Sequence, residues 1–251
     1  MGMNVYAGTF TRYYARNWKT ASQKFCEENG IAFRQIRTDN SPPHPVEEIM
    51  DGVNIWQNRL VEVLHNSGVP AAEPWEENNE KPYYTDKPDW DAFGALALYA
   101  ASKLLDKKTP KDYPKGMDYN SHPLMRKISK SSFGGLSLFS GVYHWIPVND
   151  SIMFKYPLVN GITADIGTTT LLKSELIKIN ELGWKEDRNT ILGWSNTEGY
   201  PQDASFNNGR LEIKKVTEVY DTHSLAKFAF SVLWRAAEFA ENERVPVILD
   251  Y

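Results

Sequence analysis

The sequence contains almost no cysteine, since Cys26 is the single one among 251 residues. One thiol cannot form an internal disulfide, and it cannot build a cysteine-rich zinc or iron–sulfur site. Long hydrophobic runs are also missing, because the longest apolar-rich stretch, residues 93–101, is far shorter than the roughly 20 residues that cross a membrane. We therefore expect a soluble protein of a reducing compartment, the cytoplasm, with no membrane partner.

An excess of charge of one sign is absent as well. The 28 basic and 32 acidic residues give a net charge of −4, which predicts no general attraction to nucleic acid or anionic lipid. Residues 1–6 show neither the basic region nor the apolar run of a signal peptide. A hydrophobic content of 41% and an aromatic content of 13% exclude a disordered chain and favour a large core.

Motifs that identify a catalytic or cofactor site are missing too. The five histidines show no spacing typical of a zinc site. There is no glycine-rich phosphate loop and no GxSxG nucleophile elbow. Gly167 and Thr168 could open an anion site at a helix N-terminus or simply cap that helix, and we favour the cap. From these observations we expect no catalytic residue, no metal and no cofactor.

Hydrophobic periodicity is the strongest positive signal in the chain. It predicts helices over residues 17–28, 45–65, 89–106, 168–182 and 224–242. In the last of these, apolar residues recur in steps of three and four from Leu225 to Phe239. Asp89 follows Pro88 and is expected to cap the third helix.

Shorter patterns predict the strands and the fold class. Strands are expected over residues 3–10, 31–37, 136–148, 151–158, 161–166, 211–220 and 245–251. Together the elements predict an α+β fold, in which one small mixed or antiparallel sheet is packed by about five helices. Residues 1–251 are expected to form a single globular domain with long loops near 68–88 and 107–123.

The segment 85–91 contains three carboxylates, Asp86, Asp89 and Asp91. Such a cluster could work as an acid–base pair or hold a hard cation, but Asp beside Pro is also typical of turns and helix caps, which we favour. Residues 73–91 are mostly acidic and residues 103–130 mostly basic. These two stretches either pair with each other or present a polar surface to a partner.

Several segments resemble a family of uncharacterised bacterial proteins. The resemblance lies in residues 5–14 with 17–18, in 83–91, in 143–156 and in the ending 225–251. It implies no known activity and no catalytic residue. A small, acidic, aromatic-rich chain without a site motif is also similar in type to the immunity proteins of bacterial toxin systems.

These observations favour a non-enzymatic intracellular bacterial binding protein, immunity-like, which meets a protein partner such as a toxin through an acidic and aromatic surface. The candidate binding residues are Arg12, Tyr13, Tyr14, Trp75, Tyr83, Tyr84, Asp86, Asp89 and His144. The alternative is a small-substrate hydrolase or transferase, for which Arg12, Asp86, Asp89 and His144 would have to meet in one pocket. A third interpretation is a structural subunit that self-associates through its terminal helix.

Overall fold

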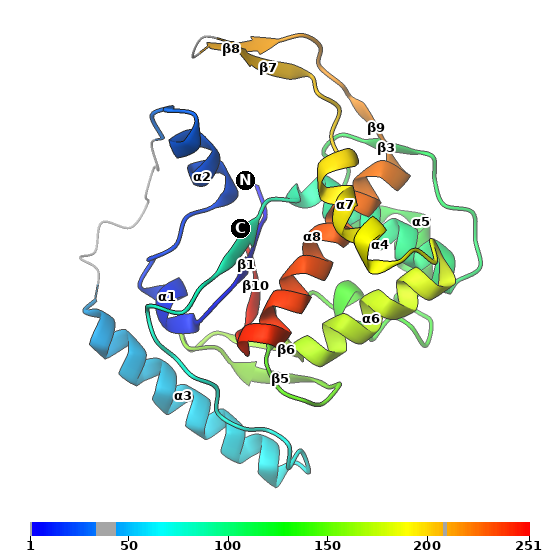
Figure 1. Ribbon diagram of the computed structural model, residues 1–251. Coiled ribbons are helices and arrows are strands. Elements are labelled where there is room, and N and C mark those ends of the chain that lie inside the picture. The colour runs from blue at the N-terminus through cyan, green and yellow to red at the C-terminus, as the bar shows by residue number, and fades with distance from the viewer. Residues whose placement is uncertain (1, 34–43, 208–209) are drawn as a thin grey trace.

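The computed structural model describes residues 2–33, 44–207 and 210–251, and a six-stranded sheet lies at its centre (Figure 1). The strands are β1 (Asn4–Ala7), β2 (Tyr84–Asp86), β4 (His144–Ile146), β5 (Met153–Pro157), β6 (Thr163–Thr168) and β10 (Val247–Asp250). They follow the order β2-β1-β10-β4-β6-β5. The neighbours β4 and β6 are parallel, and the other neighbouring pairs are antiparallel, so the sheet is mixed.

Helices cover both faces of this sheet. The helices are α1 (Phe10–Tyr14), α2 (Ala21–Glu28), α3 (Val46–Asn66), α4 (Asp89–Leu104), α5 (Pro123–Ile128), α6 (Thr169–Leu182), α7 (Arg188–Thr197) and α8 (Thr222–Glu243). Figure 1 shows α4, α6 and α8 on one side of β1 and β10, and α1 and α3 on the other. We name these the α8 face and the α3 face of the sheet.

Two short ribbons and two 3-10 turns complete the chain. The ribbons pair β3 (Asp112–Pro114) with β9 (Val219–Asp221) and β7 (Ala204–Asn207) with β8 (Arg210–Ile213), and the 3-10 turns are Tyr119–Ser121 and Ser137–Phe139. In Figure 1 the β7–β8 ribbon projects from the body beyond β9.

The larger core lies on the α8 face. Twelve of the sixteen residues of α4 are buried, which matches its apolar residues on all sides. This helix packs along α8, and the sheet adds Val5, Leu249 and Trp145 beneath them. Burial of these fully enclosed side chains supplies the main hydrophobic stabilisation.

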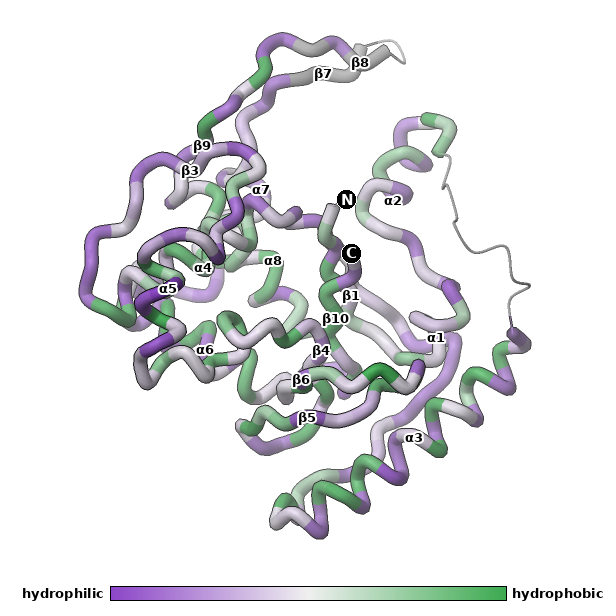
Figure 2. The backbone as a smooth tube through the Cα atoms, turned by 180° about the vertical axis from the view of Figure 1, so that it is seen from behind, coloured by the Kyte–Doolittle hydropathy of each residue, from purple (hydrophilic) through white to green (hydrophobic). Residues whose placement is uncertain are grey.

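A second core fills the α3 face. The predicted stripe of α3, from Val53 through Trp56 and Leu60 to Leu64, is buried against Tyr6 and Ile248 of the sheet. Figure 2 shows the alternation of hydrophobic and hydrophilic residues along this helix. The helix predicted over residues 45–65 is therefore present, and its observed bounds, Val46–Asn66, lie one residue later at each end.

The α+β class is confirmed, but the small sheet with about five helices is wrong. The described residues contain eight α-helices, a six-stranded mixed sheet and two-stranded ribbons. Among the missed elements, β2 and β3 have three residues each and α1 has five. Three residues hold too few side chains to show a period of two, so sequence pattern could not count these strands.

Predictions for the first part of the chain also need correction. The strand expected over 3–10 ends at Ala7, because the chain turns into α1 at Phe10. The helix expected over 17–28 begins at Ala21, and none of its residues is buried. Phe25, the aromatic residue of this helix, is 51% exposed. Of the strand expected over 31–37, residues 31–33 are not in a strand, and residues 34–37 lie outside the described part.

Three further predictions differ from the structure. Only 144–146 of the strand expected over 136–148 pairs in the sheet. The strand expected over 211–220 is divided between β8 and β9. Asp89 does not cap α4 but is its first residue, after Pro88, with a left-handed φ of +59°.

Candidate binding site

The site begins with the short helix α1, which follows β1 directly on the α3 face. Thr9 caps it, since its hydroxyl oxygen accepts a hydrogen bond of 3.2 Å from the Arg12 N–H. The carboxylate of Glu77, 66 and 67 residues away, accepts the Thr11 N–H at 2.8 Å and the Phe10 N–H at 3.2 Å. Two kinds of partner thus hold the first turn and fix the direction in which the side chains of α1 point.

Glu77 is buried and also accepts a hydrogen bond of 2.8 Å from the Trp75 indole N–H. Burial raises the pKa of Glu77, while its N–H donors act in the opposite direction. Trp75, a surface candidate that could equally fold back onto the core, is only 3% exposed and lies in the core of the α3 face. Glu77 therefore stabilises α1 from within the core, with Trp75 as its hydrogen-bond donor. Neither side chain is placed to contact a binding partner.

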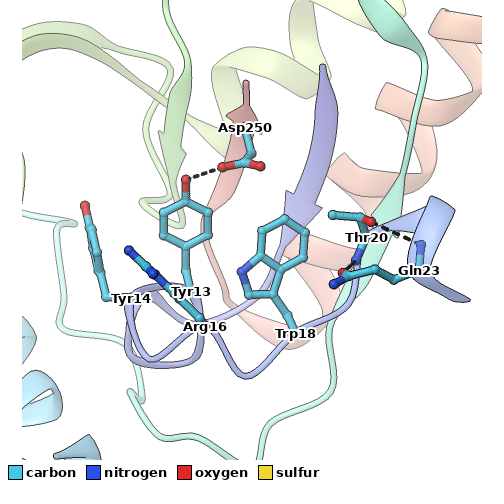
Figure 3. Close-up of a pocket in the computed structure, with 7 residues that line it drawn as sticks. All are labelled: Tyr13, Tyr14, Arg16, Trp18, Thr20, Gln23 and Asp250. Atoms are coloured by element: carbon cyan, nitrogen blue, oxygen red, sulfur yellow. Dashed lines mark hydrogen bonds between the residues drawn. The ribbon is translucent and has the colours of Figure 1, made fainter. Parts of the chain in front are cut away.

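A pocket of about 390 Å³ opens beside α1 (Figure 3). We call it the Tyr13 pocket. It is lined by Tyr13, Tyr14, Arg16, Trp18, Thr20, Gln23 and Asp250. These residues come from α1, from the loop after it, from the start of α2 and from β10. The paired strands β1 and β10 thus bring distant parts of the chain to one place.

Aromatic rings form the walls of the Tyr13 pocket. The Trp18 ring stacks on Tyr13 with centroids 5.8 Å apart, and it also contacts Tyr6 at 4.8 Å. Tyr13 and Tyr14 meet edge to face at 5.3 Å. Such contacts fix each ring before any ligand arrives, which lowers the entropy lost on binding.

One carboxylate lies among these rings. The Tyr13 hydroxyl donates a hydrogen bond of 2.7 Å to Asp250 Oδ1. Burial raises the pKa of Tyr13 well above its usual value, and the Asp250 carboxylate raises it further. Burial also raises the pKa of Tyr14 to about 12. Both phenols are therefore protonated near neutral pH and can donate hydrogen bonds, and neither is available as a base.

Tyr83 joins the pocket to α2. Its hydroxyl accepts a hydrogen bond of 3.0 Å from the Lys19 N–H. The Arg12 guanidinium and the Lys24 ammonium lie 5.1 Å and 4.6 Å from the centre of its ring. The cation–π contact of Lys24 holds α2 against the body even though α2 has no buried residue. Arg12 thus packs on Tyr83 and does not line the pocket itself.

Gly8 makes room for this arrangement. A Cβ atom at residue 8 would collide with the Tyr6 hydroxyl oxygen, and it would come within 2.9 Å of the Tyr83 Cβ. The missing side chain at Gly8 therefore lets Tyr6 reach back to donate a hydrogen bond of 2.9 Å to the Thr9 carbonyl.

His144 lies on the same face of the sheet, deeper than the pocket. Its ring centroid is 6.4 Å from that of Phe10. Burial lowers the pKa of His144 to about 4, so the imidazole is neutral near pH 7. Its Nδ1 atom is buried without a hydrogen-bond partner in the described part of the chain. His144 is therefore an interior imidazole and does not line the Tyr13 pocket.

The other candidates lie on the α8 face. Asp86 pairs with Val5 across the sheet, and partners in register point to the same side, so Asp86 faces away from Arg12 and His144. Tyr84 packs on Phe239 of α8 and donates a hydrogen bond of 3.1 Å to Asp86. Asp89 begins α4 on this side as well. The sheet therefore separates Asp86, Asp89 and Tyr84 from the candidates on the α3 face.

The structure thus brings together only part of the predicted set. Arg12, Tyr13, Tyr14 and Tyr83 lie around the pocket. Sequence reasoning missed Asp250 as a site residue, and it assigned Trp18 to a helix that begins three residues later. One signal for Asp250 was present, because it is a charged residue ending the apolar strand β10.

A metal site is not indicated by the described side chains, which contain no group of three or more histidine, cysteine, aspartate or glutamate residues able to hold an ion. No helix within residues 2–33, 44–207 and 210–251 combines the length and the apolar composition needed to cross a membrane. No protein-family model, no curated protein and no solved structure matches this chain. The site must therefore be interpreted from its own chemistry.

Proposed function

We propose that this chain is a non-enzymatic binding protein that engages a protein partner through the Tyr13 pocket. The observation that carries the proposal is the set of preformed aromatic walls around Asp250, with Tyr13 held to that carboxylate at 2.7 Å. Tyrosine and tryptophan in a fixed, concave setting are typical of the residues that dominate binding energy at interfaces. Asp250 gives the pocket a polar group that can select the side chain entering it.

The distribution of the acidic candidates supports binding over the alternative hydrolase or transferase. That alternative needs Arg12, Asp86 and His144 in one pocket, but Asp86 lies on the opposite face of the sheet from the other two. The neutral imidazole of His144 lies under Phe10, away from the Tyr13 pocket lining. An acid–base pair from these residues would have to act through the sheet, which hydrogen-bond distances forbid.

Photo-crosslinking from inside the pocket tests the proposal. We would place p-benzoylphenylalanine at Tyr14, and as a matched control at Ile177, which is 40% exposed on α6. We expect a discrete protein adduct from position 14 alone, and its loss when Trp18→Ala removes one wall. Identical adducts from both positions, or no adduct from position 14 in cells that make the protein, would contradict the proposal.

The immunity-like form of the hypothesis is tested separately. If the partner is a toxin, the crosslinked protein should inhibit growth when made alone, and co-expression of this chain should restore growth. Trp18→Ala should weaken that protection, whereas a substitution at Ile177 should leave it unchanged. Growth inhibition that this chain does not relieve would exclude a toxin as the partner.

A further inference from the structure

A second cavity, of about 570 Å³, lies on the α8 side of the molecule between the start of α4, the loop after β3 and strand β9. We call it the Tyr220 cavity. Six of its lining residues bear on what it could bind, namely Asp89, Trp90, Asp91, Lys115, Tyr200 and Tyr220. It has no residue in common with the Tyr13 pocket, so a ligand of this cavity is independent of the function proposed above.

The three aromatic rings that line this cavity are held in place by contacts with other residues of the protein. The Tyr200 hydroxyl donates to the Pro88 carbonyl at 3.0 Å and accepts from the Ala92 N–H at 3.2 Å. The Tyr220 ring stands perpendicular to Tyr200, with centroids 5.3 Å apart. Trp90 meets the ring of Tyr251 edge-on at 5.3 Å. Because these hydrogen bonds and ring contacts already restrict the rings, little conformational entropy is lost when a ligand binds.

The charge around these rings is predominantly negative. Asp91 accepts a hydrogen bond of 2.9 Å from the Gly116 N–H, and Asp89 lies 3.6 Å from Lys87. Burial raises the pKa of Asp91 and the Asp89 carboxylate adds to this, while the Gly116 N–H and Lys115 oppose it. The Asp91 carboxylate, whose ionisation is disfavoured by burial and by the nearby Asp89, would be stabilised by an incoming positive charge.

The pKa of Tyr220 is also affected by the negative charge near the cavity. Burial raises the pKa of Tyr220, and the carboxylates of Asp91, Asp203, Glu218 and Asp89 raise it further. Lys115 is the cation that lines the cavity. These four carboxylates outnumber the nearby ammonium groups of Lys115, in the lining, and Lys87, beside Asp89, which favours a cationic ligand over a neutral or anionic one.

We propose that the Tyr220 cavity binds a free small organic cation of the methylated-ammonium class. Aromatic faces attract such cations through their quadrupole, and carboxylates at the rim add Coulombic attraction. A bare divalent ion fits less well, because the described residues contain no group of three or more ligating side chains. Trp90, Tyr200 and Tyr220 supply the walls, and Asp89 and Asp91 supply the charge.

Titration with choline tests the proposal against its neutral isostere, 3,3-dimethyl-1-butanol. Binding is followed by the indole N–H resonance of Trp90 in the full chain. We expect saturable shifts with choline and none with the alcohol. Asp91→Asn should weaken choline binding about fivefold or more, and Lys115→Gln should strengthen it. Equal binding of both probes, or no saturable shift at tens of millimolar choline, would overturn the proposal.

Two controls keep the outcome specific. Asp51→Asn removes the same charge from the exposed side of α3 and should leave choline binding unchanged. If it weakens binding as much as Asp91→Asn, the loss of affinity is a general effect of charge and the cavity is not the site.

Vesicles of phosphatidylcholine distinguish a free ligand from a lipid headgroup. Retention of the protein on these vesicles, lost in Asp91→Asn, would assign the cavity to a lipid headgroup and overturn the proposal of a free ligand. Melting temperatures of all variants establish that they are folded.

Discussion

Glu77 illustrates what single residues contribute to this fold. Its carboxylate is enclosed, and it accepts hydrogen bonds from two backbone N–H groups of α1 and from the Trp75 indole. Those donors would otherwise be buried without a partner, which costs far more than a hydrogen bond gains. The first turn of α1, and with it the orientation of Tyr13 and Tyr14, therefore depends on one side chain that is distant in sequence.

Glu77→Ala is accordingly expected to lower the free energy of unfolding by about 2–4 kcal/mol, because it leaves buried donors unsatisfied. Urea denaturation followed by tryptophan fluorescence measures this. The neighbouring Glu76→Ala is the matched control, since Glu76 has a side chain that is 68% exposed and lies 3.8 Å from Lys81. It should change stability by less than about 0.5 kcal/mol. Similar losses in the two variants would show that Glu77 does not support α1 in this way.

His144 makes stability depend on pH. In the unfolded chain its imidazole takes up a proton near pH 6.5, but in the folded protein only near pH 4, because burial lowers its pKa. Protonation therefore favours unfolding, and stability falls as the pH drops from about 6.5 towards 4, by up to about 3 kcal/mol. Burial raises the pKa of Glu77 and Glu175, which act in the opposite direction over the acidic range.

Comparison with His144→Phe isolates this contribution. Relative to the unmodified protein, the variant should gain stability steadily as the pH is lowered from 7 to 4.5, measured by urea denaturation at each pH. The carboxylates titrate equally in both proteins, so their effect cancels in the difference. A stability difference that stays constant with pH would contradict the assigned imidazole pKa.

At the scale of elements, α2 differs from the other long helices because it is attached without being buried. Lys24 of α2 lies over the Tyr83 ring, and the Lys19 N–H, just before α2, donates to the Tyr83 hydroxyl. A helix with so little apolar burial opens locally at a lower free energy than the core helices. Since α2 supplies Gln23 to the Tyr13 pocket, its opening also widens that pocket.

Hydrogen exchange tests this attachment. Tyr83→Ala should speed exchange of the amides in 21–28 about tenfold or more while leaving those of α3 unchanged. Tyr83→Phe keeps the ring and loses the hydroxyl, so it should give an intermediate rate. Faster exchange throughout the protein in Tyr83→Ala would mean that Tyr83 supports the whole fold and not α2 in particular.

The elements that sequence could predict are those whose pattern repeats over several turns. The stripes of α3 and α8, the Thr168 cap of α6 and its end at Gly183 depend on neighbouring residues, and the structure has them. Elements held by distant partners were missed. Nothing in residues 10–14 indicates that Glu77 will stabilise a helix there, and β2 pairs with β1 from inside a proline-rich stretch.

The candidate site shows the same limit. Tyr13, Tyr14 and Arg12 were identified from composition and position in the sequence, and the structure places them at or beside one pocket. The grouping of Asp86 with His144 failed because a side chain's face depends on strand register, and register is fixed by pairing between residues at least 77 positions apart in the sequence. Asp250 joins the site through such pairing, since β10 lies beside β1.

At the scale of the whole molecule, one sheet carries both cores. Alternate residues of β10 enter the two cores, with Leu249 on the α8 face and Ile248 on the α3 face. Loss of either layer would expose one side of the shared sheet to water. The described residues are therefore expected to unfold as a single cooperative unit, as predicted for the one-domain chain.

Truncations in each core test this cooperativity. Leu233→Ala in α8 and Leu60→Ala in α3 remove fully buried side chains and should each cost about 3–5 kcal/mol. In both variants, far-ultraviolet circular dichroism and tryptophan fluorescence should report one coincident transition, shifted to lower urea. Separation of the two signals in Leu60→Ala would show that the α3 face melts on its own.

The position of β10 has a consequence for how the protein is made. Residues 247–250 lie between β1 and β4, so they join two parts of the sheet that are not otherwise paired with each other. During synthesis on the ribosome these residues emerge after the other strands of the sheet, and until then the β1–β2 pair and the β4–β6–β5 group have no common partner. Closure of the sheet is thus a late, long-range event with a high contact order, and the nascent chain exposes unpaired strand edges until it occurs.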